Sequence, residues 1–543
     1  MKMKKNSIYF LCFFFSSFLF GQESADSFSK SVWVSDNGDG TYTNPIINAD
    51  YSDPDVIRVG DKFYMTASSF NCIPGLPILE SNDLVNWKLI NYGLKKQIPS
   101  NFYNKAQHGK GVWAPCIRYH NKEFYIYYPD PDYGIYMIKS TKAEGQWSEP
   151  ILVKKGKGLI DPTPLWDDDG KTYLVYAFAG SRAGIKSVLV GCTMNAEGTV
   201  ANNDEVLLFD GHQDEPTLEG PKIYKKNGYY YIFAPAGGVA TGWQTAFRSK
   251  NIYGPYENKK VLDQGASKVN GPHQGAWIQT KSGEDWFIHF QDKGIIGRVV
   301  HLQPMKWIND WPIIGIDTNG DGIGEPVSTY KKPNVGKSYP VVYQKESDEF
   351  SKPKLDLQWQ WHANPQINWG FPSSYGYYML NCIPKPKKAV NLFDVPNLLL
   401  QKFPSEEFTA TTKLNVNFNF DEEEAGFLVM GLDYCLLRIK QTESKLYLSQ
   451  MICLNADKNQ AESEAATVLL KGNIVYLQVK ALADGICTFL YSEDGTDFKN
   501  IGIPFKAREG KWIGSKVGFV AQRNGFINNA GNVKIDWIRF NKI

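Results

Sequence analysis

The stretch "DGKTYLVYA" (residues 169–177) combines an Asp-Gly turn with an alternating aromatic strand. A turn of this kind ahead of such a strand predicts a β-hairpin. Four related stretches occur elsewhere: "GDKFYMTAS" (60–68), "NKEFYIYY" (121–128), "NGYYYIFA" (227–234) and "GEDWFIHF" (283–290). Their aligned aromatic residues recur every 48 to 61 residues, at Tyr64, Tyr125, Tyr173, Tyr231 and Phe287. A repeat of this length in an all-β chain predicts a five-bladed β-propeller.

One unusual residue precedes each aligned aromatic residue by 11 to 14 positions, and these are Asp53, Trp113, Asp161, Glu219 and His273. The inner strand of each propeller blade runs along the central axis, so equivalent positions converge at one end of the channel. We therefore expect the three acids to face one another across a pocket. The competing explanation is that each acid only caps a strand or accepts hydrogen bonds from a turn.

Three carboxylates around one pocket suit glycoside hydrolysis. One carboxylic acid protonates the leaving oxygen while a carboxylate on the other side activates water or attacks carbon. A third, ionised acid raises the pKa of the proton donor by like-charge repulsion. Three acids and a histidine could instead bind a hard cation. The acids lie far apart in sequence and beside proline, in "SDPDV", "IDPTP" and "EGPKI", unlike a compact calcium loop.

Several motifs together resemble glycoside hydrolase family 43, above all its β-xylosidases and α-L-arabinofuranosidases. They are "NPIINADYSDPDVIRVGDKFYMTASSFNCIPGLPILESNDLVNW", "GVWAPCIRY", "IDPTPLWDDDGKTYLVY", "EGPKIYKKNGYYYIF", "NGPHQGAWIQT" and "GRVVHLQPMKW", in family order from about Asn44 to Trp311. The resemblance implies a five-bladed propeller and an inverting mechanism. It makes Asp53 the general base, Asp161 the pKa-modulating and orienting acid, and Glu219 the general acid.

The resemblance also marks four substrate-binding residues. Phe70 and Trp113 match aromatic residues that pack on the terminal sugar, although either could simply belong to the core. His273 matches a histidine that touches the sugar or helps to hold a central ion. Arg298 matches an arginine beside the catalytic acids, where it would keep Asp53 ionised; an outer-face salt bridge is the alternative.

Residues 22–340 are therefore the expected propeller, and residues 341–543 a second domain. Alternating strands such as "IVYLQVKAL" (474–482) predict a β-sandwich there. "DEFSKPKLDLQWQWHANP" and "KIDWIRF" resemble the concanavalin A-like domain that accompanies family 43 β-xylosidases. In such relatives a sandwich loop can close one side of the pocket, which favours attack on chain ends.

The first 21 residues are typical of a signal peptide. Lys2, Lys4 and Lys5 precede an apolar run, from about Ile8 to Phe20, that is too short to span a bilayer. We therefore expect a periplasmic or secreted protein without a membrane anchor. The net charge of +2, without long runs of one sign, gives no indication of a nucleic-acid partner. The sequence carries no signal for an oligomeric state.

A loop at "DTNGDGIGEP" (317–326) begins like a calcium loop, but Ser328 stands where the bidentate glutamate belongs. A polar surface loop is the preferred interpretation. No cofactor or metal is required by the expected chemistry, and a bound Ca²⁺ is compatible with it.

The sequence thus predicts an exo-acting, inverting glycosidase that releases terminal pentose, with β-D-xylose first and α-L-arabinofuranose as the close alternative. From another class, a non-catalytic sugar-binding propeller remains an alternative. The substrate is an oligosaccharide or polysaccharide whose parent could be xylan, arabinan, pectin or an algal glycan such as ulvan.

Overall fold

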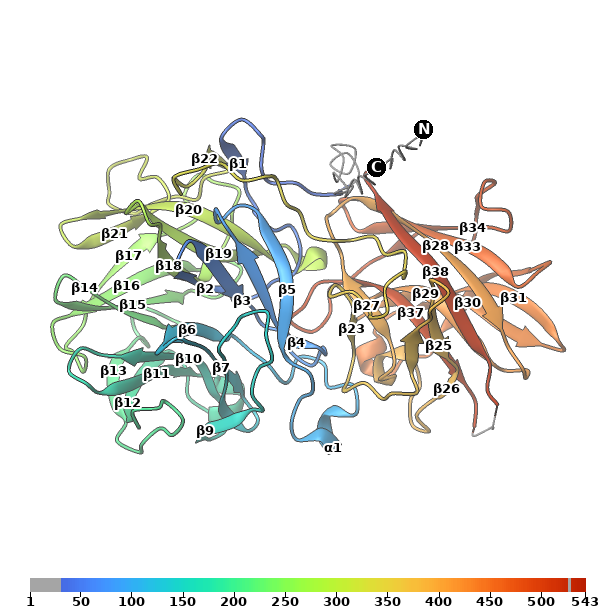
Figure 1. Cartoon of the computed structure of the whole chain (residues 1–543), viewed down its shortest axis with the longest axis horizontal. Coiled ribbons are helices and arrows are strands. Elements are labelled where there is room, and N and C mark those ends of the chain that lie inside the picture. The colour runs from blue at the N-terminus through green and yellow to red at the C-terminus, as the bar shows by residue number, and fades with distance from the viewer. Residues whose placement is uncertain (1–30, 526–528) are drawn as a thin grey trace, which may run out of the picture.

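The computed structural model describes residues 31–525 and 529–543. The expected signal peptide, residues 1–21, lies outside the described residues. Two all-β units, a propeller and a sandwich, lie side by side (Figure 1). The predicted fold class is therefore confirmed.

The propeller consists of five antiparallel sheets, each with four strands in chain order. Blade 1 contains β2 (Asp55–Val59), β3 (Lys62–Thr66), β4 (Gly75–Ser81) and β5 (Trp87–Leu94). Blade 2 contains β6 (Cys116–His120), β7 (Glu123–Asp130), β8 (Gly134–Ser140) and β9 (Ile151–Lys155). Blade 3 contains β10 (Leu159–Trp166), β11 (Thr172–Phe178), β12 (Val188–Met194) and β13 (Val206–Asp210).

Blade 4 contains β14 (Lys222–Lys226), β15 (Tyr229–Ala236), β16 (Trp243–Ser249) and β17 (Glu257–Leu262). Blade 5 contains β18 (His273–Gln279), β19 (Asp285–Asp292), β20 (Arg298–Ile308) and β21 (Trp311–Ile314). The five aligned aromatic residues all lie on the second strand of a blade, and each predicted turn joins the first strand to the second. The prediction of five repeated hairpins is therefore confirmed.

Short helices occur between these strands and in the sandwich. They are α1 (Ser100–Tyr103), α2 (Gly180–Ala183), η2 (Gly294–Ile296), η3 (Leu392–Asp394) and η4 (Ala456–Lys458).

Two eight-stranded sheets form the sandwich. The first contains β23 (Gln360–Trp361), β27 (Leu399–Lys402), β37 (Lys516–Arg523), β29 (Glu424–Met430), β30 (Tyr434–Thr442), β31 (Lys445–Cys453) and β32 (Ser463–Leu469), with β26 (Ile383–Pro384) beside β37. The second contains β24 (Gly370–Pro372), β25 (Tyr378–Asn381), β38 (Asn532–Asn541), β28 (Phe408–Asn417), β33 (Ile474–Ala481), β34 (Ile486–Ser492) and β35 (Lys499–Asn500), with β36 (Phe505–Lys506) beside β34.

Burial along the strands differs between the two units. Strand β28 alternates strictly between buried and half-buried residues, as a sheet with one covered face requires. Strand β7 is buried along almost its whole length, because each face of a blade packs on a neighbouring blade. This difference explains why the propeller strands are so rich in aromatic residues.

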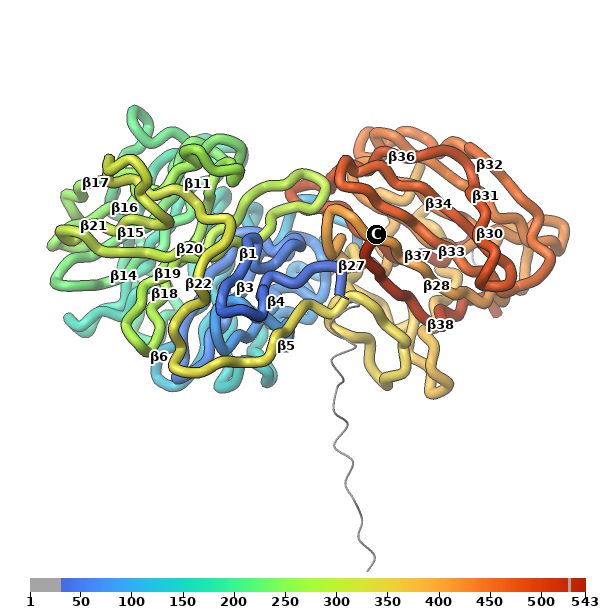
Figure 2. The backbone as a smooth tube through the Cα atoms, turned by 90° about the horizontal axis from the view of Figure 1, so that it is seen from above, coloured from blue at the N-terminus to red at the C-terminus, as the bar shows by residue number. Residues whose placement is uncertain are grey.

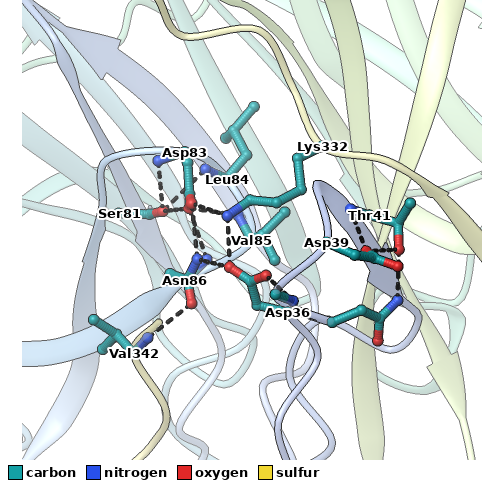
Figure 3. Close-up of polar contacts among 12 residues, drawn as sticks. Asp36, Asp39, Thr41, Ser81, Asp83, Leu84, Val85, Asn86, Lys332 and Val342 are labelled. Atoms are coloured by element: carbon teal, nitrogen blue, oxygen red, sulfur yellow. Dashed lines mark hydrogen bonds and ion pairs between the residues drawn. The ribbon is translucent and has the colours of Figure 1, made fainter. Parts of the chain in front are cut away.

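A polar clasp, made of Asp36, Asp83, Asn86 and Lys332, joins the start of the propeller to its end (Figure 3). The Lys332 Nζ lies 2.5 Å from Asp36 Oδ2 and 2.9 Å from Asp83 Oδ2. The Asn86 amide donates to both carboxylates, at 2.7 Å each. Nearby, β1 (Thr41–Thr43) pairs with β22 (Thr329–Lys331). The segments before blade 1 and after blade 5 are thereby fixed to each other.

The sandwich lies next to blade 1 of the propeller in Figure 1 and also in Figure 2, where the molecule is seen from above. Ile73 and Trp361 form a backbone bridge between the two units. The side chain of Asn364 accepts from the Gln97 N–H at 2.8 Å and donates to the Gln97 carbonyl at 2.9 Å. The buried Lys516 Nζ lies 2.9 Å from Cys72 Sγ. This interface brings the loop between β36 and β37 to the mouth of the propeller.

Candidate active site

A cavity of about 230 Å³ opens where the inner strands of the propeller converge. Residues from all five blades and one from the sandwich line it. They are Asp53, Phe70, Trp113, Ala114, Ile160, Asp161, Thr217, Glu219, Gly238, Val239, Gln274, Arg298 and Trp512. Of the seven residues predicted from sequence, six line this cavity. His273 lies behind it instead, with a fully buried ring.

The backbone is unusual where the functional side chains enter the cavity. Asp53, Phe70 and Asp161 have φ values of 55°, 49° and 56°, in the left-handed region that residues with a Cβ rarely adopt. Asp161 also lies where the pairing of β10 with β11 shifts register, between Ile160 and Thr163. Such a bulge redirects a side chain out of the regular strand pattern. This local geometry explains how a carboxylate at the start of a buried strand reaches the cavity.

Asp53 is held by hydroxyl donors and by a cation. Ser52 Oγ and Ser68 Oγ donate to Asp53 Oδ2 at 2.6 Å and 2.5 Å. The Arg298 Nη1 lies 3.4 Å from Asp53 Oδ1 and donates to Ser52 Oγ at 2.9 Å. These contacts fix the carboxylate in one orientation. Arg298 thus lies beside the acid and not in an outer-face salt bridge.

Glu219 faces the cavity more openly than Asp53. Its side chain is 32% exposed, whereas that of Asp53 is 6% exposed. The His273 Nε2 lies 3.1 Å from Glu219 Oε1, so the buried imidazole supports this carboxyl group from behind. A half-exposed carboxyl supported on one side is suited to reach an oxygen at the cavity entrance.

Asp161 lies beside Glu219 in a buried position. Its Oδ2 accepts a 2.7 Å hydrogen bond from the N–H of Gly220, the residue after Glu219. Burial raises the pKa of Asp161 well above its usual range, and the neighbouring Glu219 charge adds to this. The buried Lys222 and the Gly220 N–H act in the opposite direction. The surroundings of Asp161 in the free site therefore oppose the ionised state that we expect for it from the sequence.

Aromatic side chains form one wall of the cavity. The ring centroids of Phe70 and Trp113 are 6.4 Å apart, and those of Trp113 and Trp512 are also 6.4 Å apart, both in edge-to-face arrangements. The Arg182 guanidinium lies 5.2 Å from the centre of the Trp113 ring. Apolar ring faces of this kind stack on the C–H surfaces of sugars.

Trp512 comes from the sandwich and is absent from the sequence prediction. It has a φ of 64° in the loop between β36 and β37. The next residues are tied to the propeller, because the Gly514 N–H donates to Asp50 Oδ2 at 3.2 Å and the Ser515 N–H donates to the Ile295 carbonyl at 2.7 Å. From the sequence we expected a sandwich loop at the pocket but did not identify which loop it is. The blade repeat could not reveal Trp512, because it lies about 200 residues beyond the last blade.

Carboxylates of the loop at 317–326 accept hydrogen bonds from backbone N–H groups of the same loop. Asp317 accepts from the N–H groups of Gly320 and Gly322, at 2.7 Å and 2.9 Å, and Asp321 accepts from the Ile323 N–H at 2.8 Å. Within residues 31–525 and 529–543, no group of three or more His, Cys, Asp or Glu side chains is arranged to hold a metal ion.

In the same part of the chain, no helix is long and apolar enough to cross a membrane.

The arrangement combines a fixed carboxylate, a second carboxyl group at the entrance and an aromatic wall, which is the equipment of a glycoside hydrolase. Two family models match the chain: glycosyl hydrolases family 43 over residues 42–312, and the β-xylosidase C-terminal concanavalin A-like domain over residues 347–541. The chain belongs to glycosyl hydrolase family 43, and it is a glycosidase.

Individual relatives are similar to this chain over most of its length. A protein of Xylanibacter ruminicola is 38% identical over 89% of this chain and 86% of its own length. A β-xylosidase of Formosa agariphila is 32% identical over 93% of this chain and 91% of its own length. The crystal structure of the family 43 protein BlXynB of Bacillus licheniformis is 26% identical, with a TM-score of 0.79 over 93% of this chain and 100% of that one.

Proposed function

We propose that this glycosidase removes terminal pentose units from the ends of oligosaccharides by inversion, with β-D-xylose as the preferred sugar. The observation that carries the proposal is the placement of Asp53, Asp161 and Glu219 around one small cavity. With about 230 Å³ the cavity lies below the roughly 300–1,000 Å³ of typical ligand pockets. A space of this size suits one chain end better than a long polysaccharide.

In this mechanism Asp53 is the general base. It accepts a proton from a water molecule as that water attacks the anomeric carbon. The two serine hydroxyls and Arg298 support this role, because they keep the Asp53 carboxylate in one orientation. Glu219 is the general acid, and it delivers its proton to the departing glycosidic oxygen. Asp161 orients Glu219 through the turn at Gly220.

The sugar preference rests on the relatives. The similar protein of Formosa agariphila is a β-xylosidase. A relative from Bacteroides ovatus, 30% identical over 72% of this chain and 74% of its own length, is a non-reducing end α-L-arabinofuranosidase. We therefore propose α-L-arabinofuranose as the second substrate. A non-catalytic sugar-binding role is the third candidate, and it is disfavoured by the three intact acids.

Stereochemistry tests the mechanism. Hydrolysis of an aryl β-D-xyloside should release α-xylose first, seen by proton NMR within the first minutes before mutarotation. Inversion requires space for water between the two carboxyl groups, which are then roughly 6.5–9.5 Å apart. Early appearance of the β-anomer would remove the water-activating role from Asp53.

Export and cofactor use belong to the same proposal. Lys2, Lys4, Lys5 and the apolar run after them support removal of residues 1–21 and a periplasmic or secreted location. N-terminal sequencing of the mature chain tests this, since a start at Met1 would contradict it. The proposed steps need only carboxyl groups and water, so a chelator should leave the rate unchanged.

A further inference from the structure

We propose that Gln274 is a sugar-binding residue whose side-chain carbonyl accepts a hydrogen bond from one ring hydroxyl of the bound pentose. This inference rests on the proposed function and deepens it, because it names a group that reads the hydroxyl pattern. The side chain lines the cavity together with Asp161 and Glu219.

The backbone turns Gln274 toward the cavity. Between His273 and Gly275 the pairing of β18 with β19 shifts register, so Gln274 is the extra residue of a bulge. Its φ of 35° lies in the left-handed region, which an ordinary strand residue would avoid. Blade 3 uses the same device to present Asp161. Backbone strain of this kind concentrates at functional sites, where a side chain must leave the regular pattern.

The neighbouring blade leaves space for this side chain. A Cβ added at Gly220 would lie 2.6 Å from Gln274 Cγ and 2.9 Å from Gln274 Cδ. The Gln274 side chain therefore lies directly against the turn that carries Glu219 and that donates to Asp161. A sugar that reaches the proton donor must also come close to the Gln274 amide.

The Gln274 oxygen is buried and unpaired. The residue is only 6% exposed, and Oε1 accepts no hydrogen bond from the protein. Among the cavity-lining residues only Arg298 Nε shares this property, and it has the Asp292 carboxylate at 3.7 Å. Leaving a buried polar group unpaired costs roughly 1–3 kcal/mol. An apolar side chain would fill the same space without that cost, so a ligand hydroxyl, met by a rotation of the amide that turns Oε1 into the cavity, is the partner that explains the amide.

Charge makes the amide distinct from its neighbours. Asp53, Asp161, Glu219 and Arg298 are ionisable, and the Thr217 hydroxyl already donates to the Pro216 carbonyl at 2.6 Å. Gln274 therefore offers a neutral acceptor that no other group of the protein uses. A site built to bond a hydroxyl discriminates strongly against a sugar that lacks it, because its own polar group then stays unpaired.

Deoxy substrates test the assignment. The kcat/KM values of the wild type, Gln274→Met and Gln274→Ala are measured on an aryl β-D-xyloside and on its 2-, 3- and 4-deoxy forms. We expect one deoxy form to cost the wild type roughly tenfold, the size of one hydrogen bond with its desolvation. That same deoxy change should cost the two variants nearly nothing, while the other two deoxy changes keep their wild-type effects.

Gln244→Met is the matched control, because Gln244 is also buried with an unpaired Oε1 but lies outside the cavity lining. It should show the wild-type pattern on all four substrates. Deoxy effects that are equal in the wild type and in active Gln274 variants would overturn this inference and leave the proposed function intact. A Gln244→Met control that shows the pattern expected of the Gln274 variants would do the same. Failure of the wild type to hydrolyse any aryl pentoside would instead overturn the proposed function, and this inference with it.

Discussion

Asp53 and Glu219 differ in their surroundings, and the difference predicts different losses on substitution. Asp53 is buried among hydroxyl donors, whereas Glu219 is half-exposed at the entrance. An aryl leaving group departs readily without a proton, but a sugar hydroxyl does not. Glu219→Ala should therefore lose roughly 10²–10⁴-fold in kcat/KM on a xylo-oligosaccharide and much less on a nitrophenyl xyloside. Asp53→Ala should lose a similar factor on both substrates. Parallel losses in the two variants would mean that the roles are wrongly assigned.

Asp161 predicts a second effect at the residue scale, this time on stability. Its folded pKa is raised by burial and by Glu219, so the folded state holds a proton that the unfolded state releases above about pH 4. Stability should fall as the pH rises above that value, by at most about 1.4 kcal/mol per pH unit. Asp161→Asn removes this titration. The variant should melt at a higher temperature than the wild type at pH 7, with the difference vanishing near pH 3, in calorimetric scans across pH. A variant less stable than the wild type at pH 7 would contradict this account of the site.

The sequence predicts residues better than it predicts their orientation. The spacing of Asp53, Asp161 and Glu219 ahead of the aligned aromatic residues is visible as a repeat, and these acids do meet in one cavity. The position of His273 behind Glu219 was not predictable, because a shift of one position along a bulged strand separates it from the cavity-lining Gln274. Bulges and left-handed residues leave only weak traces in sequence when glycine does not occupy them.

At the scale of elements, hairpins and turns follow from local chemistry. The Asp-Gly and Asn-Gly turns at 169–170 and 227–228 form as expected, because Gly170 and Gly228 supply the positive φ that such turns need. Closure of the propeller is a long-range matter. The polar clasp joins residues almost 300 positions apart, and neither Asp36 nor Lys332 has a local pattern that indicates its partner.

The clasp makes a prediction of its own. Lys332 neutralises two carboxylates whose side chains are 4% and 2% exposed, so Lys332→Met would leave both buried without a cation. We expect a loss of about 3 kcal/mol in the free energy of unfolding at pH 7, measured by urea denaturation. Although burial opposes it, bonding to Asn86 and Lys332 holds the pKa of Asp36 below its usual range. The stabilisation that comes from the Asp36 carboxylate is therefore present above about pH 4 and is lost at lower pH as Asp36 takes up a proton.

The variant and the wild type should accordingly converge in stability below about pH 3. Lys331→Met is the matched control, since this neighbouring lysine is exposed and should cost little. A gap between Lys332→Met and the wild type that stays constant down to pH 2 would assign the loss to packing of the lysine stem and not to its charge.

At the scale of the whole molecule, the sandwich completes the catalytic unit. The partly buried Lys402 and the buried Lys516 project from it against the propeller, where Lys402 donates to the Asp50 carbonyl and Lys516 contacts Cys72. Burial lowers the pKa of Lys402 to about 8. Asp50 and Cys72 lie two or three residues from Ser52, Asp53 and Phe70, so the interface and the active site use the same backbone segments. The sandwich therefore supports the site as well as adding a side chain to it.

Trp512 is the direct test of that shared site. The side chain is 45% exposed and contributes little to the core, but it forms the part of the aromatic wall that the propeller lacks. Trp512→Ala should lower kcat/KM on xylobiose roughly tenfold, since one aromatic contact is worth about 1.5 kcal/mol. Its melting temperature should stay within about 2 °C of the wild type. Leu454→Ala removes another exposed apolar side chain of the sandwich, 55% exposed and away from the cavity, and should leave kcat/KM unchanged. Full activity of Trp512→Ala on xylobiose would limit the sandwich to a supporting role, because the pocket would then work without the side chain that the sandwich contributes.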